Sequence, residues 1–122
     1  MSIQVELDKV REQVAACGPY AFLLTVTDDG RPHAVSLTVD WDGDELVCAP
    51  GSRTLANAER GGEVSLLWPV SGRAGFTLFV NGAAEVRVDG ESKKVAVKPT
   101  SAVLHKTPEG EAQAPGCVRV LP

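Results

Sequence analysis

The sequence contains few of the residues on which metal sites and disulfide frameworks depend. Its three cysteines lie far apart, at Cys17, Cys48 and Cys117, and its two histidines are His33 and His105. This set makes neither a zinc-type cysteine pair nor an obvious disulfide framework, and it offers no close His/Cys cluster. We therefore expect reduced, mostly buried thiols and no dedicated metal site.

Long apolar runs and excess positive charge are also missing. No uninterrupted apolar segment approaches the ~20 residues of a membrane helix, and the charged start MSIQVELDKVREQ lacks the apolar core of a secretory signal. The net charge of -4 argues against a nucleic-acid partner. The tight basic pair Lys93-Lys94 is explained equally well by a solvated strand edge. The sequence therefore predicts a cytoplasmic protein with neither a membrane nor a nucleic-acid partner.

A chain of 122 residues predicts one compact domain over residues 1–122. Folding should bury roughly two-thirds of the surface that the unfolded chain exposes, which is enough for a core of its own. The segment 108–122 is rich in Pro, Gly, Ala and Glu, and we expect it to be loosely structured.

Two helices are expected. An apolar residue recurs every three or four positions at Ile3, Leu7, Val10 and Val14. This spacing predicts an N-terminal amphipathic helix, which Gly18-Pro19 ends. A second, short helix is predicted at about Ser52–Arg60, before the Gly61-Gly62 pair.

The rest of the chain has the pattern of short β-strands. The predicted strands are residues 20–27, 33–41, 45–49, 63–68, 76–88, 93–99 and 101–107. The first is apolar on both faces, which is typical of a strand covered on both sides. Gly30 and Gly43 lie in turn segments, and Gly82 predicts a bulge or bend in the longest strand. Six to seven strands joined mostly by antiparallel hairpins predict a mostly β fold, a small closed antiparallel barrel whose short helix follows the third strand.

The segment CAPGSRTLANAERGG, Cys48–Gly62, allows two interpretations. Ser52 could simply cap the short helix, as serine often does. Alternatively, Ser52 and Arg53 could hold an anion, because a helix N-terminus carries unpaired N–H groups and arginine offers a planar fork of donors. These residues alone leave the ordinary cap as the simpler interpretation.

Several strings, taken in order, resemble the flavin-binding split-barrel family that includes pyridoxamine 5'-phosphate oxidase. After an apolar strand come DDGRPHAVSLTV, ELVCAPGSR opening a helix, EVSLLWP and FTLFVNGAAEV, which together span about Tyr20–Val88. The most specific part is GSR followed by a short helix and VSLLWP. The resemblance implies a split β-barrel that forms a homodimer with flavin sites at the interface, and an oxidoreductase that passes electrons through FMN to or from a small molecule.

The same resemblance implies a set of cofactor-binding residues: Ala34, Val35, Ser36, Leu37, Cys48, Ala49, Ser52, Arg53, Thr54 and Thr77. The strand 34–37 would line the isoalloxazine ring, and residues 48–49 would flank the ribityl chain. Residues 52–54 would bind the phosphate, with Thr54 as a helper. Thr77 matches a polar side chain that the partner subunit offers across the interface.

The chain also departs from the oxidase proper. Where that enzyme has basic residues on the second strand and after the arginine of its phosphate loop, this chain has Pro32, Leu37 and Thr54. A weaker hold on phosphate is expected, since a hydrogen bond to a charged group contributes about 1.5–3 kcal/mol. An Arg-x-His substrate segment is missing from the C-terminal part. We therefore expect a flavoprotein other than a pyridoxamine phosphate oxidase.

Two other functions remain open. A related branch of these barrels uses the deazaflavin F420, whose acidic tail would need a basic groove, for which the candidates are Arg31, Arg53, Arg60 and Arg73. The barrel could instead be a non-catalytic module that binds a small ligand or haem. No catalytic residue is assigned; His33 is either a proton donor or simply exposed, and the same alternatives apply to His105.

Overall fold

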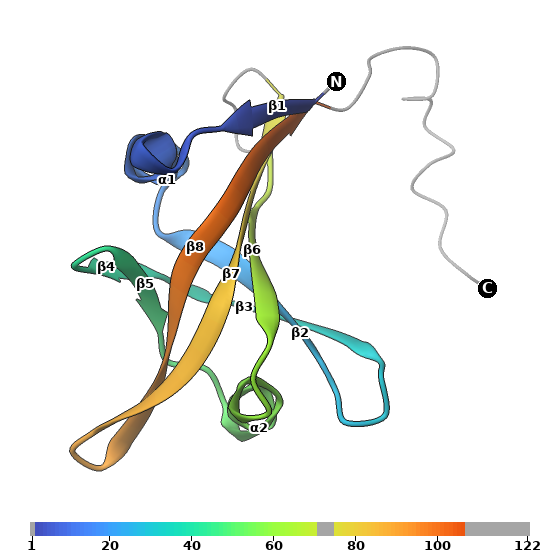
Figure 1. The fold of residues 1–122 in the computed structure, drawn as a ribbon, viewed down its shortest axis with the longest axis vertical. Coiled ribbons are helices and arrows are strands. Elements are labelled where there is room, and N and C mark those ends of the chain that lie inside the picture. Colours follow the sequence, from blue (N-terminus) through green and yellow to red (C-terminus); the bar gives the residue numbers. More distant parts are fainter. Residues whose placement is uncertain (1, 71–74, 107–122) are drawn as a thin grey trace.

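The computed structural model describes residues 2–70 and 75–106 (Figure 1). Its elements, in chain order, are β1 (Ser2–Val5), η1 (Leu7–Lys9), α1 (Val10–Cys17), β2 (Tyr20–Val26), β3 (Pro32–Thr38), β4 (Asp40–Asp42), β5 (Glu45–Cys48), α2 (Ser52–Glu59), β6 (Glu63–Trp68), β7 (Phe76–Asp89) and β8 (Ser92–Lys106). The mostly β class predicted from the sequence is confirmed.

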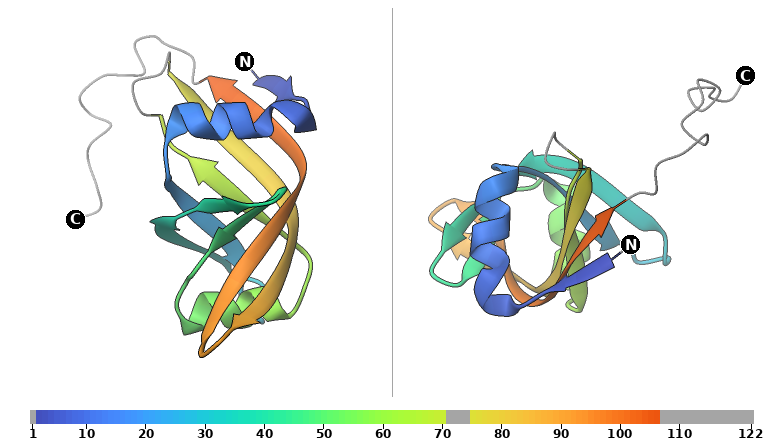
Figure 2. Two further views of the ribbon diagram at one scale, coloured as in Figure 1. Left: turned by 90° about the vertical axis from the view of Figure 1, so that its left-hand side faces the viewer. Right: turned by 90° about the horizontal axis from the view of Figure 1, so that it is seen from above.

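The strands form one antiparallel sheet that curls but does not close, so the closed barrel predicted from the strand pattern is wrong and the split barrel implied by the resemblance is confirmed. The order of its strands is β3-β2-β6-β7-β8-β5-β4, and β1 pairs with the C-terminal part of β8. The two strands at the ends of this order, β3 and β4, follow one another in the chain but are not paired. The result is a split barrel, with α1 across one end and α2 at the other (Figure 2).

The core follows from strand alternation. One row across four strands, Leu23, Leu66, Val80 and Ala102, is completely buried. Burial of each large apolar side chain in such a row stabilises the fold by about 1.5–3 kcal/mol. Trp68 is also buried, and its indole N–H donates to the Gly18 carbonyl at 2.9 Å. That bond ties the end of α1 to the sheet.

The predicted bend at Gly82 is confirmed. Pairing between β7 and β8 shifts at this point, where Asn81 faces Ser101 and Gly82 faces Pro99. A Cβ atom at Gly82 would lie 2.3 Å from the Lys98 carbonyl oxygen, so no larger residue fits without moving the backbone. The irregularity lets the two longest strands bend around the core.

The predicted N-terminal helix begins later than expected. Ile3 belongs to β1, where it pairs with Leu104, and Leu7 lies in the short 3-10 turn. Val10 and Val14 are the buried helical positions. The error arose because the helical spacing continued by coincidence into a segment whose partner lies a hundred residues away.

Two strand predictions are also corrected. The predicted strand 33–41 is divided into β3 and β4 at Val39, whose N–H donates to the Pro19 carbonyl at 2.8 Å. The predicted strands 93–99 and 101–107 are one strand, β8. Lys93 and Lys94 pair with β7 but lie beyond the end of the β5 pairing, which stops at Cys48 and Val95, so their other side is a strand edge, as predicted.

The outer side of β2 is not covered within one chain. Tyr20 is 72% exposed, Phe22 39% and Val26 54%, whereas Ala21, Leu23 and Thr25 are buried. The prediction of a strand covered on both sides is therefore wrong for the single chain. A large apolar surface is left on this side of the sheet.

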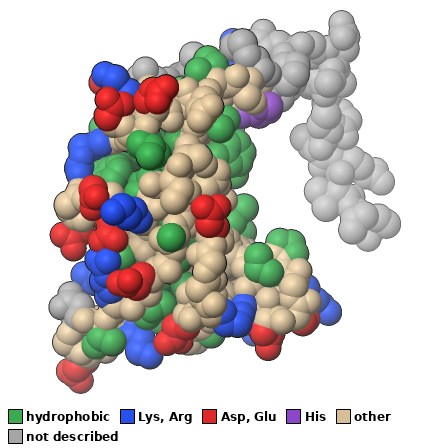
Figure 3. Space-filling view, viewed as in Figure 1, with side chains coloured by type: hydrophobic (Ala, Val, Ile, Leu, Met, Phe, Trp, Pro, Cys, Tyr) green, Lys and Arg blue, Asp and Glu red, His purple; other side chains and the backbone are tan. Residues whose placement is uncertain are grey.

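Two predicted features lie outside the described residues: the segment 108–122, and Arg73, one of the four candidates for a basic groove. Among the helices of residues 2–70 and 75–106, none has both the length and the apolar content needed to cross a membrane. On the face shown in Figure 3, acidic and basic side chains are interspersed.

Candidate functional site

The edge strand β3 runs between two surface cavities. Cavity A, of about 530 Å³, is lined by Thr38 from the end of β3 and by residues of β4, β5, β7 and β8. Cavity B, of about 430 Å³, is lined by Arg31, which directly precedes β3, and by one face of α2. A strand of seven residues spans about 20 Å, so β3 links the two cavities over the length of a flavin-sized molecule.

The residues predicted to line a flavin ring lie on this linking strand, but they point in two directions. Ala34 and Ser36 are exposed on the outer side. Val35 and Leu37 are half-buried and pack against the core. Only the first two side chains, together with backbone groups of the edge strand, can meet a ligand lying on the outer side of β3.

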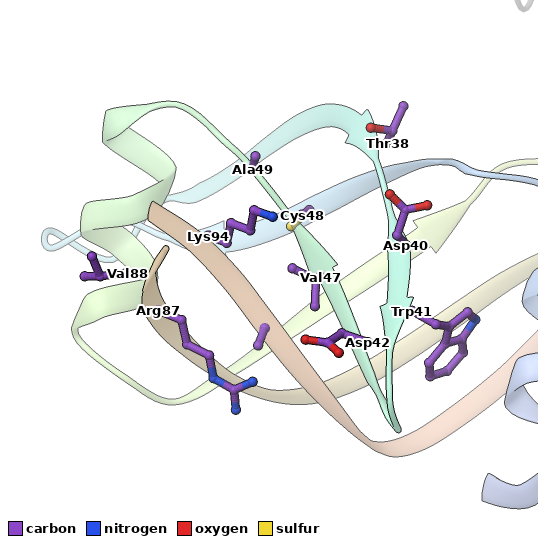
Figure 4. A pocket seen from close by; sticks show the side chains of 11 residues that line it. Thr38, Asp40, Trp41, Asp42, Val47, Cys48, Ala49, Arg87, Val88 and Lys94 are labelled. Carbon is purple, nitrogen blue, oxygen red and sulfur yellow. The ribbon is translucent and has the colours of Figure 1, made fainter. Parts of the chain in front are cut away.

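Cys48 and Ala49, predicted to flank a ribityl chain, line cavity A where β5 ends (Figure 4). Cys48 is almost completely buried, and burial raises the pKa of its thiol from the usual 9.0 to about 11. The thiol therefore stays protonated at neutral pH and is a poor nucleophile. Its place in the cavity wall gives a small, polarisable surface rather than a reactive group.

The helix α2 is not capped by Ser52. The N-cap residue is Gly51, Ser52 is the first helical residue, and no side chain caps this end within the described chain. The first turn of such a helix presents N–H groups that the helix itself cannot satisfy. The interpretation of Ser52 as an ordinary cap is therefore wrong, which leaves the anion interpretation in place.

The three residues predicted at a phosphate have different surroundings. Ser52 and Arg53 are exposed, and Arg53 lines cavity B. Thr54 is only 2% exposed, so its side chain faces the protein interior. A helper role for Thr54 would thus have to come from its backbone N–H.

Cavity B brings together three of the four arginines considered from the sequence: Arg31, Arg53 and Arg60. Arg73 lies outside the described residues. Asp28 and Asp29 also line the cavity, and Arg31 forms an ion pair with Asp29, with 3.2 Å between Nε and Oδ2. The arrangement is basic in balance but contains both signs of charge.

The arginines of cavity B are not equally available to a ligand. Arg60 donates to the Val26 carbonyl and to Asn57 Oδ1, the latter at 3.2 Å. Asn57 in turn donates to Thr25 Oγ1 at 3.0 Å, and both of these side chains are buried. This chain of hydrogen bonds holds α2 against β2. Arg53 has no hydrogen-bond or ion-pair partner within residues 2–70 and 75–106, so its guanidinium is available.

Thr77 is remote from both cavities within its own chain. It is half-buried near the start of β7 and faces His105 on β8, which in turn faces Ser2 of β1. That end of the barrel is opposite α2 (Figure 1). A shared ligand could reach Thr77 only if Thr77 came from a second chain, as the resemblance implies.

Neither histidine lines cavity A or cavity B. His33 is half-buried on β3, and His105 Nδ1 lies 3.1 Å from Ser2 Oγ. Sequence reasoning missed several residues of cavity A, of which Trp41, Arg87 and Lys94 are the largest. They come from three different strands, and only strand pairing brings them together.

An open antiparallel barrel with a helix at each end and a ligand-sized track along its split edge defines the class: the split-barrel fold of flavin-binding proteins. The family model for pyridoxamine 5'-phosphate oxidase matches residues 7–117. The chain therefore belongs to that family.

The chain is also similar to individual proteins, and the solved structures among them share its fold. An uncharacterized protein of Mycobacterium tuberculosis is 34% identical over 115 residues, and the match covers 82% of this chain and 81% of the relative. Among solved structures, the FAD binding protein from Mycobacterium smegmatis has a TM-score of 0.64 at 12% identity and covers 87% of this chain and 100% of its own. A protein described as an F420 reductase has a TM-score of 0.58 at 18% identity, covering 69% of this chain and 88% of its own.

Proposed function

We propose that this chain is a homodimeric flavoprotein that binds FMN and acts as an oxidoreductase on a small molecule. The observation that carries the proposal is the start of α2, where no side chain caps the helix and Arg53 has no partner among the described residues, at one side of an edge strand that leads to cavity A. A flavin phosphate is suited to a helix N-terminus and an arginine fork. Membership of the family supports a flavin cofactor, and the start of α2 with Arg53 would hold its phosphate.

The residues of the track would act as binding and positioning groups. Arg53 and the first-turn N–H groups of α2 would hold the phosphate, and the exposed side of β3 at Ala34 and Ser36 would support the ring. Bound FMN would supply the electron transfer. Cys48 and Ala49 would exclude water from one side of the cofactor.

The second chain of the proposed dimer is supported by the outer face of the sheet. Phe22, Leu67, Phe79 and Val103 form one row across β2, β6, β7 and β8. They lie on the side opposite the fully buried row, and Phe22 and its neighbours on β2 are substantially exposed. An apolar face of this kind favours a protein interface. Covering it with a second copy would also allow Thr77 to reach the partner's cofactor.

The test of this interface is sedimentation velocity on the purified chain. The wild type should sediment as a dimer, and Phe79→Asp should sediment as a monomer, because a carboxylate in the centre of a buried apolar row is costly unless it is paired. A matched control is Val88→Asp, whose side chain is 70% exposed and lies far along β7. A monomeric wild type would contradict the dimer.

The cofactor is tested on the same preparation. We expect a yellow protein that releases FMN on heating, and that binds FMN in calorimetry after the cofactor has been removed. Absence of binding at high micromolar FMN would contradict the proposal and would favour the non-catalytic ligand or haem module.

A second candidate, an F420-dependent reductase, is favoured by one specific observation. Cavity B gathers Arg31, Arg53 and Arg60, as an acidic polyglutamyl tail would require. Tighter binding of F420 than of FMN, with the advantage lost for the deazaflavin without its tail, would favour this candidate. Asp29, which is paired with Arg31, weakens the attraction of cavity B for a multiply charged tail, so FMN remains the proposal.

A further inference from the structure

The outer face of the sheet, proposed as the dimer surface, also carries the side of β3 that would support a flavin ring. The apolar row on this face consists of Phe22, Leu67, Phe79 and Val103. Ser36 of β3 pairs with Phe22, and paired residues point to the same side of a sheet. The cofactor track is therefore one edge of the proposed interface, and residues at the other edge are candidates to close the track from a second copy.

The other edge of this face carries a small polar group. Thr77 of β7 pairs with His105 of β8, which pairs with Ser2 of β1. All three lie two residues beyond the apolar row, at the end of the barrel opposite α2 (Figure 1). At the same level, the β3 edge carries Thr38 paired with Tyr20, and both side chains are exposed. The polar group thus lies level with the end of the track that is farthest from α2.

His105 is held by one ring nitrogen and leaves the other available. Its Nδ1 lies 3.1 Å from Ser2 Oγ, and this contact orients the imidazole. Its Nε2 has no hydrogen-bond partner within residues 2–70 and 75–106. When the Ser2 hydroxyl donates to Nδ1, the neutral ring carries its proton on Nε2 and is a donor there. The side chain is half-buried, so part of its surface is open to a second chain or a ligand.

We propose that His105 donates a hydrogen bond from Nε2 to the isoalloxazine ring of a flavin held on β3 of the other copy in the dimer. The inference rests on the proposed function, because it requires both the flavin and the dimer. A two-fold axis parallel to the strands would lay the β8–β1 edge of one copy over the β3 edge of the other. His105 then meets the ring end of the track, while the phosphate stays with Arg53 at the start of α2. Each copy contributes both edges, so the dimer contains two identical sites.

The first test compares two replacements of His105 by titration with FMN and with riboflavin, which has no phosphate. His105→Leu should weaken the binding of both ligands equally, by about two- to tenfold, as expected for the loss of one neutral hydrogen bond. His105→Gln is the matched control and should keep most of the affinity, because its amide nitrogen can donate from the place of Nε2. Sedimentation velocity should show both variants as dimers. Unchanged affinity in His105→Leu, or equal losses in the two variants, would overturn the proposal.

The second test asks whether His105 acts across the interface. Chains with Arg53→Ala and chains with His105→Leu are produced together in equal amounts, so that mixed dimers form. If each site takes Arg53 from one copy and His105 from the other, one site of a mixed dimer carries both replacements and the other carries neither. About a quarter of all sites should then bind FMN with the affinity of the wild type. If both residues of a site come from one chain, no such fraction forms, and the proposal is overturned.

Failure of the proposed function gives a different result. A wild type that is monomeric, or that binds neither FMN nor riboflavin, overturns the proposed function and this inference with it. A dimeric wild type that binds flavin, together with a His105→Leu variant that binds both ligands equally well, overturns the assignment of His105 alone.

Discussion

Replacement of Arg53 by alanine tests the anion site most directly. The guanidinium of Arg53 is exposed, lines cavity B and has no partner among the described residues, so its removal breaks no internal contact. The first turn of α2 stays in place because Asn57 and Arg60 anchor the helix to β2. The substitution should therefore change ligand binding and leave the melting temperature as it is.

The expected magnitude follows from the surroundings of this side chain. A hydrogen bond to a charged group contributes about 1.5–3 kcal/mol, and exposure to solvent favours the low end of that range. We expect a loss of about 1–2 kcal/mol, which corresponds to about 5- to 30-fold weaker FMN binding. The effect is smaller than for a buried pair because water competes for both partners.

The assay is calorimetric titration of cofactor-free protein with FMN and with riboflavin. Arg53→Ala should weaken FMN binding and leave riboflavin binding unchanged, because the lost contact is to the phosphate. Arg31→Ala is the matched control: it also removes a cation from cavity B, but one already paired with Asp29. If FMN binding is unchanged in Arg53→Ala, or falls equally for riboflavin, then Arg53 is an ordinary solvated side chain and the phosphate site lies elsewhere.

Two further predictions concern stability. Gly82→Ala should lower the free energy of unfolding by about 3 kcal/mol or more, the upper part of the range for overpacking, because the new methyl group would lie 2.3 Å from the Lys98 carbonyl oxygen. Urea unfolding measures this free energy. The control is Gly51→Ala, whose methyl group would meet nothing within 4 Å and should change the free energy of unfolding much less. Since burial raises the pKa of Cys48 from 9.0 to about 11, the folded state resists forming the thiolate, and the free energy of unfolding should fall as pH rises through that range. Cys48→Ala should fall less steeply over the same range, and parallel curves for the two proteins would contradict this assignment.

The local sequence pattern was sufficient to predict those elements whose deciding contacts are close in the sequence. The strand β6 was predicted with its observed bounds, and α2 ends one residue earlier than the predicted helix. The turn glycines Gly30 and Gly43 both have positive φ, as their turn positions require. In each case the residues that decide the structure lie within a few positions of one another.

Elements that depend on distant partners were not predictable in this way. Ile3 continued a helical spacing, but pairing with Leu104 makes it a strand residue. The segments 93–99 and 101–107 were predicted as two strands, and Pro99, at the end of the first, cannot donate to a ladder. The bulge opposite Gly82 accommodates it within one continuous strand instead. Tertiary pairing decided both cases against local preference.

In the candidate site, too, some features could be predicted from a short segment and others depended on tertiary contacts. The uncapped helix start and Arg53 could be found from one short segment, but the grouping of Arg31 with Arg53 could not, because Arg31 comes from the turn before β3. The pair Lys93-Lys94 did carry a usable signal. Because side chains alternate along a strand, two adjacent lysines must point to opposite faces of the sheet, so they cannot share one role. Lys93 meets Glu59 beside α2, and Lys94 meets cavity A.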